Sequence, residues 1–590
     1  MNDQLAIQGN LKSDPVTQVI VQHALASAAD QMALNLYRTA YSTIVRDCLD
    51  FSTSLCDEQG QIIAQGVTLP HHIASVPFAM QSLLKKFEKN IQPGDIFILN
   101  DPFDGGMHIP DIFIVRPIFR EDQRIAFAVT TAHHADLGGR LPGSAACDNT
   151  EIFQEGLRIP WLKLYDGGEA NETIFSLIKT NVRLPEITLG DLRAQLAATH
   201  IGEGAILKLI ERYGLKIFQA CCKDLITYTE RLVRTEIASW PNGSHTFIDY
   251  MDSDGVGGPP VRLQVKITIE GSTLVADFTG TDLQVKGGIN CTLSFTTSVV
   301  AVCLRAVIRS EIPNTAGMFK PVKVIAPLGT VANATMPAAS SMRGITGFRL
   351  SDTVRGALAG LLPDRVFAAG EGGNTLVIFG GNRPNNQPYV YYELVTGTWG
   401  GRPDRDGNDG LCNPSSIASN VPIEQAECEF PVQVKAYGLV PDSGGPGRFR
   451  GGLAIERKWQ LLSGSANVTI RSDRRDHLPY GLKGGQPGRP SINELSYDDE
   501  TIILPTMIST VLKAGQILSH QLAGGGGWGD ALTRDPNAVI DDVKNEKVSL
   551  EAARREYGVV MCKNTGELDY IKTKALRKQR KNKEKKEFQL

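Results

Sequence analysis

Two neighbouring segments decide how this chain folds: N-D-P-F-D-G-G-M-H-I-P-D-I-F-I-V at residues 100–115 and A-V-T-T-A-H-H-A-D-L-G-G at residues 128–139. Each joins a run of β-branched or aromatic residues to a compact group of His and Asp. Such runs favour extended backbone, so we predict one strand over residues 112–115 and another over residues 125–131. If the two strands pair antiparallel, the start of the first lies beside the end of the second.

The predicted pairing would gather imidazoles and carboxylates in one place. His108 and Asp111 stand where the first strand begins, and His133, His134 and Asp136 stand where the second ends. A divalent metal with nitrogen and oxygen ligands is the simplest reason to assemble such a set. The alternative is a group of ordinary turn residues that are solvated or hydrogen-bonded. The residues alone leave both interpretations open, because H-x-x-D is less specific than a motif such as H-E-x-x-H.

Other polar positions near the N-terminus carry similar alternatives. Asp50 precedes an alternating F-S-T-S-L segment, which predicts a strand with an acid at its start, although a capping or turn aspartate is the ordinary interpretation. We predict that His71 and His72, in L-P-H-H-I-A-S-V-P, are solvated imidazoles of a polar loop. Glu155, in E-I-F-Q-E-G-L-R-I-P, lies in a loop that either covers the His/Asp group as an active-site wall or stays solvated.

Composition limits the class of protein. The 590 residues are 42% hydrophobic and 21% charged, as in globular proteins, and suffice for several cores of domain size. The formal net charge of −3 provides no global field for nucleic acid or an anionic membrane. Ten scattered Cys without C-x-x-C argue against a disulfide framework and a thiolate zinc site. We see no secretory signal and no apolar run of about eighteen residues, so we expect a cytoplasmic protein.

The chain in order indicates an α+β fold. Apolar residues at helical spacing predict helices, and alternating segments separated by glycine turns predict antiparallel strands from residue 244 onward. The predicted helices cover residues 16–41, 75–89, two or three segments within 173–240, 292–308 and 351–362. We expect a mixed α/β region with the metal site at 1–240, a β-rich region with inserted helices at 241–530, and a helical hairpin with a basic tail at 531–590.

The glycine clusters and the basic tail give weaker indications of function. The clusters G-T-W-G-G-R-P-D-R-D-G-N-D-G at 397–410 and G-G-P-G-R-F-R-G-G at 444–452 could be anion-binding nests, but neither has the P-loop form. We interpret them as structural turns. The tail at 572–586 has nine Lys or Arg, which predicts disorder or a solvated helix. No base-reading or stacking residues accompany that charge, so we predict no nucleic-acid partner.

Several motifs together resemble the hydantoinase B/oxoprolinase family. They are N-D-P-F-D-G-G-M-H-I-P-D, A-H-H-A-D-L-G-G, E-I-F-Q-E-G-L-R-I-P, G-D-L-R-A-Q and G-G-G-G-W-G-D, in order over nearly the whole chain. Members of this family are subunits of ATP-dependent enzymes that act on cyclic amides or small ketones. The resemblance implies a hetero-oligomer in which a hydantoinase A-type partner binds ATP and phosphorylates the substrate, and this chain completes the reaction at a metal.

The resemblance also implies roles for particular residues. The ligands of a divalent metal (zinc, manganese or iron) would be Asp50, His108, Asp111 and His133. We prefer His133 to His134 because adjacent strand residues point to opposite faces, and the family spacing agrees. His134 and Asp136 would support the ligands or face the substrate, and His134 or Glu155 would move protons.

Three hypotheses for the function follow from the resemblance. The first is the metal-bearing subunit of an ATP-dependent hydantoin or lactam amidohydrolase, which cleaves a cyclic amide C–N bond. The second is the equivalent subunit of an acetone- or acetophenone-type carboxylase. The third is a non-catalytic scaffold for the ATP-binding partner.

Overall fold

The computed structural model describes residues 14–587 except 73, 373–374, 396 and 563–565. The first thirteen residues, in which we predict no secretory signal, lie outside the described residues. Helices and several mostly antiparallel sheets alternate along the chain, which confirms the predicted α+β class. None of the helices in the described part combines the length and apolar character needed to cross a lipid bilayer.

The N-terminal sheet contains the two predicted strands. Its order is β2-β1-β5-β4-β3-β6-β7. The strands are β1 Phe51–Asp57, β2 Ile62–Gln65, β3 Ile96–Leu99, β4 Asp111–Arg120, β5 Gln123–His133, β6 Leu162–Asp166 and β7 Glu169–Ala170. The antiparallel pairing of β4 with β5 is confirmed, and both strands extend beyond the predicted ranges.

Helices α1 and α5 cover one face of this sheet. The helices of this part are α1 Pro15–Thr39, α2 Thr43–Arg46, α3 Ser75–Phe87, α4 Glu172–Asn181, α5 Pro185–Tyr213 and α6 Leu215–Ala238. Gly202 lies inside α5, although glycine commonly indicates a turn or an irregularity. A Cβ at this glycine would lie 2.6 Å from Met32 Sδ and 3.0 Å from Leu55 Cδ2, so the glycine lets α5 approach α1 and β1.

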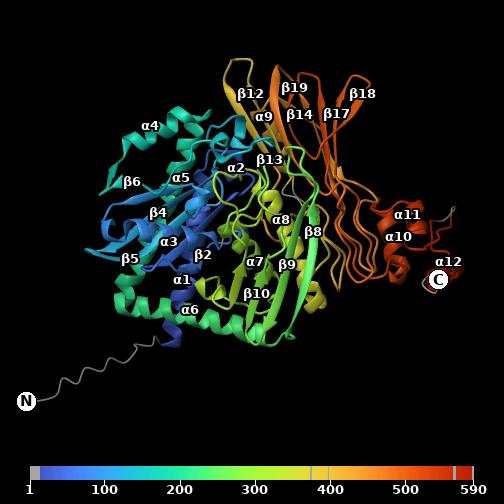
Figure 1. The fold of residues 1–590 in the computed structure, drawn as a ribbon, viewed down its shortest axis with the longest axis horizontal. Coiled ribbons are helices and arrows are strands. Elements are labelled where there is room, and N and C mark those ends of the chain that lie inside the picture. The colour runs from blue at the N-terminus through green and yellow to red at the C-terminus, as the bar shows by residue number, and fades with distance from the viewer. Residues whose placement is uncertain (1–13, 73, 373–374, 396, 563–565, 588–590) are drawn as a thin grey trace, which may run out of the picture.

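A second sheet, in the order β11-β10-β9-β8, follows in the chain (Figure 1). Its strands are β8 Gly243–Met251, β9 Val261–Glu270, β10 Thr273–Asp277 and β11 Val322–Ile325, and its helices are α7 Leu293–Val307 and α8 Arg343–Leu361. Helix α8 begins eight residues before the predicted start. Gly344 and Gly347 weaken the helical signal there, yet a Cβ at Gly347 would lie 2.3 Å from the Phe295 ring, so packing requires a glycine.

Two further sheets follow, and the helical hairpin and basic tail lie at the far end of the molecule (Figure 1). One sheet has the order β13-β12-β16-β19, and the other has the order β14-β15-β20-β17-β18. The elements are β12 Thr375–Asn382, β13 Pro388–Val395, α9 Ile423–Glu429, β14 Val432–Leu439, β15 Ile455–Leu461, β16 Ser465–Arg471, β17 Ile492–Tyr497, β18 Glu500–Leu504, β19 Met507–Lys513, β20 Ile517–Gln521, α10 Pro536–Lys544, α11 Leu550–Arg555 and α12 Tyr570–Glu587. One continuous hydrophobic core runs from Val21 in α1 to Leu522 after β20. The regions expected at 1–240 and 241–530 therefore share a core.

The two glycine clusters pair through their backbones with a third glycine-rich segment, residues 523–530. Gly445 N donates to Gly525 O at 2.7 Å, and Gly525 N donates to Gly452 O at 3.0 Å. In the first cluster, Gly401 N donates to Gly526 O of the same third segment at 2.8 Å. The clusters thus have a structural role, but as segments packed side by side rather than as separate turns.

Candidate metal centre

Three strand ends meet where the sequence predicts a metal site. Asp111 at the start of β4 pairs in register with His133 at the end of β5. On the other side of β5, His133 N donates to Asp50 O at 3.0 Å, just before β1. A turn closed by the Asp111 N to His108 O bond, 3.1 Å, adds His108. The structure therefore brings together the four residues predicted as ligands.

The side chains of this cluster face one another as the ligands of one ion would. His108 Nε2 lies 3.1 Å from Asp111 Oδ1, and neither atom has a hydrogen-bond partner within the described residues. Two ligand atoms bound at about 2 Å to one tetrahedral ion lie about 3 Å apart. Candidate ligand atoms of His108, Asp111 and His133 all lie within 4.8 Å of one another. This spacing is compatible with coordination of one shared ion.

His72 is also part of the cluster, which corrects the prediction of solvated imidazoles at His71 and His72. Both are buried, with 4% and 2% of their surface exposed. His72 Nε2 lies 3.8 Å from Asp50 Oδ1 and 4.0 Å from Asp111 Oδ2, and the three side chains form a second potential ligand group. His71 packs edge-on against the rings of neighbouring phenylalanines instead. Helix η1, Pro70–His72, turns both rings inward, a feature that residue types alone do not reveal.

One ring nitrogen of each of the three cluster histidines contacts a neighbouring group. The contacts are His72 Nδ1 to Ser52 Oγ at 3.1 Å, His108 Nδ1 to Ser341 O at 3.4 Å, and His133 Nε2 to Tyr392 Oη at 3.3 Å. Within the described residues, His133 Nδ1 has no partner. Metal-binding histidines are commonly oriented through the second nitrogen in this way. The donor set therefore fits a divalent cation with nitrogen and oxygen ligands.

Protonation also suits metal binding. Burial lowers the pKa of His72 and of His108 to about 4, so both rings are neutral near pH 7 and offer a lone pair. Burial opposes ionisation of Asp111, but neighbouring His108 and Arg343 hold the pKa of its carboxyl well below the usual range. Burial and the charge on Asp111 raise the pKa of Asp50 to about 8. A nearby divalent cation would favour the ionised form of Asp50.

A small cavity opens beside these side chains, with about 30 Å³ accessible to water. This is room for about two waters, or for an ion with a water. The later part of the chain supplies much of the wall, including Arg343, Tyr392 and Arg471. Arg343 makes a hydrogen-bonded ion pair with Asp111 and stacks on Phe295, with its guanidinium carbon 4.0 Å from the ring centroid. No sequence pattern links these residues to the His/Asp cluster.

His134 and Asp136 lie outside the cavity lining. His134 points to the opposite face of β5, where its Nε2 lies 3.0 Å from Gln195 Oε1 on α5. The carboxylate of Asp136 accepts from the amides of Gly138 and Gly143 and from Arg183. Both residues hold the end of β5 in place, so a contribution to catalysis would act through positioning.

Glu155 is buried behind His108 and also lies outside the cavity lining. Its Oε1 accepts from the amides of Ser340 and Ser341, both at 2.7 Å, and Ser341 O contacts His108 Nδ1. Burial raises the pKa of Glu155 to about 8, although the backbone donors lower it. Glu155 thus fixes the loop that orients His108.

Replacing Glu155 with Gln should make stability less dependent on pH. The pKa is raised from its ordinary 4.5 to about 8, so the folded state keeps a proton that the unfolded state releases between these values. The free energy of unfolding should fall as pH rises through this window, by at most about 1.4 kcal/mol per pH unit. Gln does not titrate and removes this contribution. Urea unfolding at several pH values would measure the difference, and parallel stability curves for the two proteins would contradict it.

Known proteins resemble the chain over almost its full length. The profile of the Hydantoinase B/oxoprolinase family matches residues 14–531. The B subunit of a putative D-/L-hydantoinase from Pseudomonas sp. (strain NS671) is 33% identical, covering 96% of this chain and 98% of the relative. The crystal structure of the ATP-dependent caprolactamase from Pseudomonas jessenii superposes with a TM-score of 0.89 at 29% identity, covering 96% of this chain and 99% of that chain. A nucleotide-free acetone carboxylase structure also gives a TM-score of 0.89 over 97% of this chain and 83% of that chain, but its 18% identity shows only a shared fold.

Proposed function

The chain belongs to the hydantoinase B/oxoprolinase family, and on that premise we propose that it is the metal-bearing subunit of an ATP-dependent hydrolase that opens cyclic amides. The buried cluster of His72, His108, Asp111 and His133 carries this proposal. One ring nitrogen of each of its three histidines is held by a contact with a neighbouring group. Such preorganisation of several converging imidazoles beside a carboxylate is expected at a catalytic metal site.

A partner chain would supply the ATP chemistry. One relative is named as a B subunit, and the caprolactamase is described as ATP-dependent. The sequence of this chain has no G-x-x-x-x-G-K-[ST] motif. We therefore assign ATP binding to a hydantoinase A-type partner that phosphorylates the amide oxygen of the substrate. The phosphorylated amide is a stronger electrophile because phosphate is a good leaving group.

The residues of this chain would then prepare water for attack on that electrophile. A divalent cation bound here (zinc, manganese or iron) would lower the pKa of a coordinated water. Asp50, His72, His108, Asp111 and His133 would hold it, since they form two potential ligand groups that share Asp111. Arg343 fixes one oxygen of Asp111 and leaves the other facing His108. Since the cluster side chains are buried, bulk water is kept from the site.

Turnover assays with the partner test the proposal. Co-purification with a hydantoinase A-type partner should give ATP-dependent hydrolysis of at least one member of a panel of hydantoins, 5-oxoproline and lactams. His108→Ala should abolish this activity. His200→Ala is the control, because the His200 side chain is exposed and pairs with Glu203 on the surface of α5. Undiminished activity of His108→Ala would instead support a scaffold role.

Ketone substrates and labelled bicarbonate distinguish the carboxylase alternative. Under the proposed function, no label enters the product with any substrate of the panel. Incorporation of labelled carbon into a ketone would overturn the hydrolase assignment and leave the family assignment intact.

A further inference from the structure

Two buried arginines share the wall of the metal cavity. Arg343 is the first residue of α8 and is 6% exposed, and Arg471 is the last residue of β16 and is 3% exposed. Burial, together with the charge on Arg343, lowers the pKa of Arg471. One terminal nitrogen of Arg343 bonds Asp111, while its Nε has no hydrogen-bond partner within the described residues. The two like charges thus face the same small cavity, beside the carboxylates of Asp50 and Asp111.

The formal charges at the cavity support this inference. The two guanidinium groups balance the carboxylates of Asp50 and Asp111. A divalent cation held by the cluster raises the local charge to an excess of about two positive units. The N-terminus of α8 adds a partial positive charge, because Gly344 in its first turn also lines the cavity. An anion carrying two negative charges would neutralise this excess.

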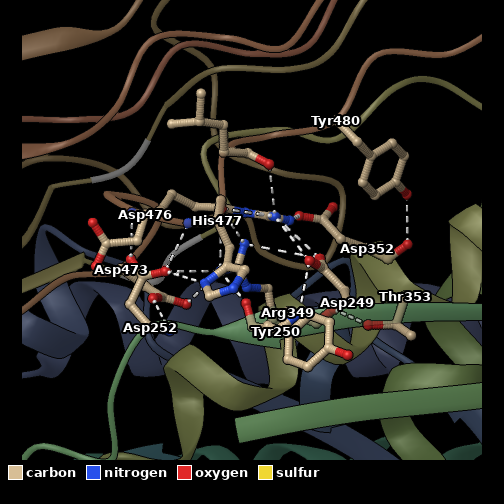
Figure 2. Close-up of polar contacts among 12 residues, drawn as sticks. Asp249, Tyr250, Asp252, Arg349, Asp352, Thr353, Asp473, Asp476, His477 and Tyr480 are labelled. Carbon is tan, nitrogen blue, oxygen red and sulfur yellow. Dashed lines mark hydrogen bonds and ion pairs between the residues drawn. The ribbon is translucent and has the colours of Figure 1, made fainter. Parts of the chain in front are cut away.

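A buried ion-pair network fixes the segments that carry the arginines. Figure 2 shows Arg349 among the carboxylates of Asp249, Asp252 and Asp473. The ion pair of Arg349 with Asp473 measures 3.0 Å, and that of Arg474 with Asp249 also measures 3.0 Å.

The positions of these pairs in the chain connect the network to the cavity. Arg349 lies on α8, less than two turns after Arg343, and Asp473 follows Arg471 by two residues. The Arg349–Asp473 pair thus ties α8 to the end of β16. The segments that carry the two cavity arginines are thus fixed before any ligand arrives, which reduces the entropy cost of binding an anion.

We propose that Arg343 and Arg471 form an anion subsite for the phosphoryl group of the activated substrate. The inference rests on the proposed function and names the part of the substrate that this chain recognises. Guanidinium groups donate paired, charge-assisted hydrogen bonds to phosphoryl oxygens. A phosphoryl group is larger than the space of about 30 Å³, so its entry displaces water and shifts side chains of the wall. The backbone segments that the network anchors are the fixed part of the subsite.

Binding of inorganic phosphate to the purified, metal-loaded full chain tests the subsite. Titration calorimetry should detect phosphate binding to the wild-type protein. Arg471→Gln should weaken it at least about tenfold, which corresponds to about 1.4 kcal/mol. Arg116→Gln should leave it unchanged. Arg116 is a suitable control because it lies on β4, the strand of Asp111, but turns to the α5 side and pairs with Glu203.

Each further outcome decides the proposal. If Arg471→Gln does not fold, Arg471→Lys must still weaken phosphate binding, because lysine keeps the charge but loses the planar pair of donors. Absence of phosphate binding to the wild type overturns the subsite even if cyclic amides are hydrolysed. Tighter binding of bicarbonate than phosphate overturns the phosphoryl assignment. Conversely, arginine-dependent phosphate binding without turnover of any substrate would sustain the subsite and refute the proposed function.

Discussion

Replacing Asp111 with Asn is expected to abolish metal binding and turnover together. Asp111 belongs to both potential ligand groups, one with His108 and His133 and the other with Asp50 and His72. The substitution preserves volume but removes the negative charge that offsets the cation. We expect the metal affinity to fall by at least about a hundredfold, beyond the loss seen when only a supporting residue is changed. Elemental analysis after gel filtration, combined with the partner-dependent assay, measures both effects.

The same substitution also carries a stability cost that must be separated from the loss of metal. Arg343 would lose the charge of its buried ion-pair partner, and breaking such a pair costs about 3–5 kcal/mol. Circular dichroism and a thermal melt establish whether Asp111→Asn is folded at the assay temperature. His108→Gln is the companion variant, because it removes a nitrogen donor without touching the ion pair. Asp166→Asn, at an exposed position on β6, is the control.

Full metal content and full rate in both Asp111→Asn and His108→Gln would show that the ligand assignment is wrong. Loss of metal in Asp111→Asn alone, with His108→Gln unaffected, would shift the assignment toward the group of Asp50, His72 and Asp111. Loss of metal in both variants would support a single site in which the two ligand groups share Asp111.

The sequence predicts the cluster because its members lie on local patterns. Two adjacent strands with His and Asp at their facing ends place Asp111 opposite His133 for any antiparallel pairing in the right register. Alternation along β5 also separates His133 from His134, which faces α5. The assignment of Asp50 as a ligand depends on the family resemblance, because an acidic residue before a strand is usually a turn residue.

The missing parts of the site depend on tertiary contacts that local patterns do not contain. His72 is buried because the turn before α3 packs against α7. The sequence around His72, however, resembles that of a solvated polar loop. Arg343 and Arg471 reach the cavity from elements more than two hundred residues after Asp111 in the chain. A buried arginine has no distinguishing sequence pattern, because the same residue is far more often exposed.

The start of α8 and the glycine clusters show the same limitation for the fold. Glycine lowers helix propensity, so the first turns of α8 read as irregular although the packing of Phe295 requires Gly347. A glycine-rich segment likewise predicts a turn from its conformational freedom. The structure uses the absence of a side chain instead, to let three backbones lie in contact.

Replacing Gly451 with Ala is therefore expected to disrupt the C-terminal part of the fold. A Cβ at this position would lie 1.9 Å from Gly525 O and 2.5 Å from Gly525 C, and both are backbone atoms that no side-chain rotation can move. Relief requires separating segments that are joined by the bond from Gly525 N to Gly452 O, so we expect a loss of about 3 kcal/mol or more, with poor recovery of soluble protein. Gly438→Ala is the matched control, because a Cβ added to this glycine on β14 would have no atom within 4 Å, and its φ is not positive. Urea unfolding of both variants measures the difference in stability. A selective loss in Gly451→Ala would show that the fold requires this backbone contact. Equal stability of the two variants would mean that the glycine segments are held loosely.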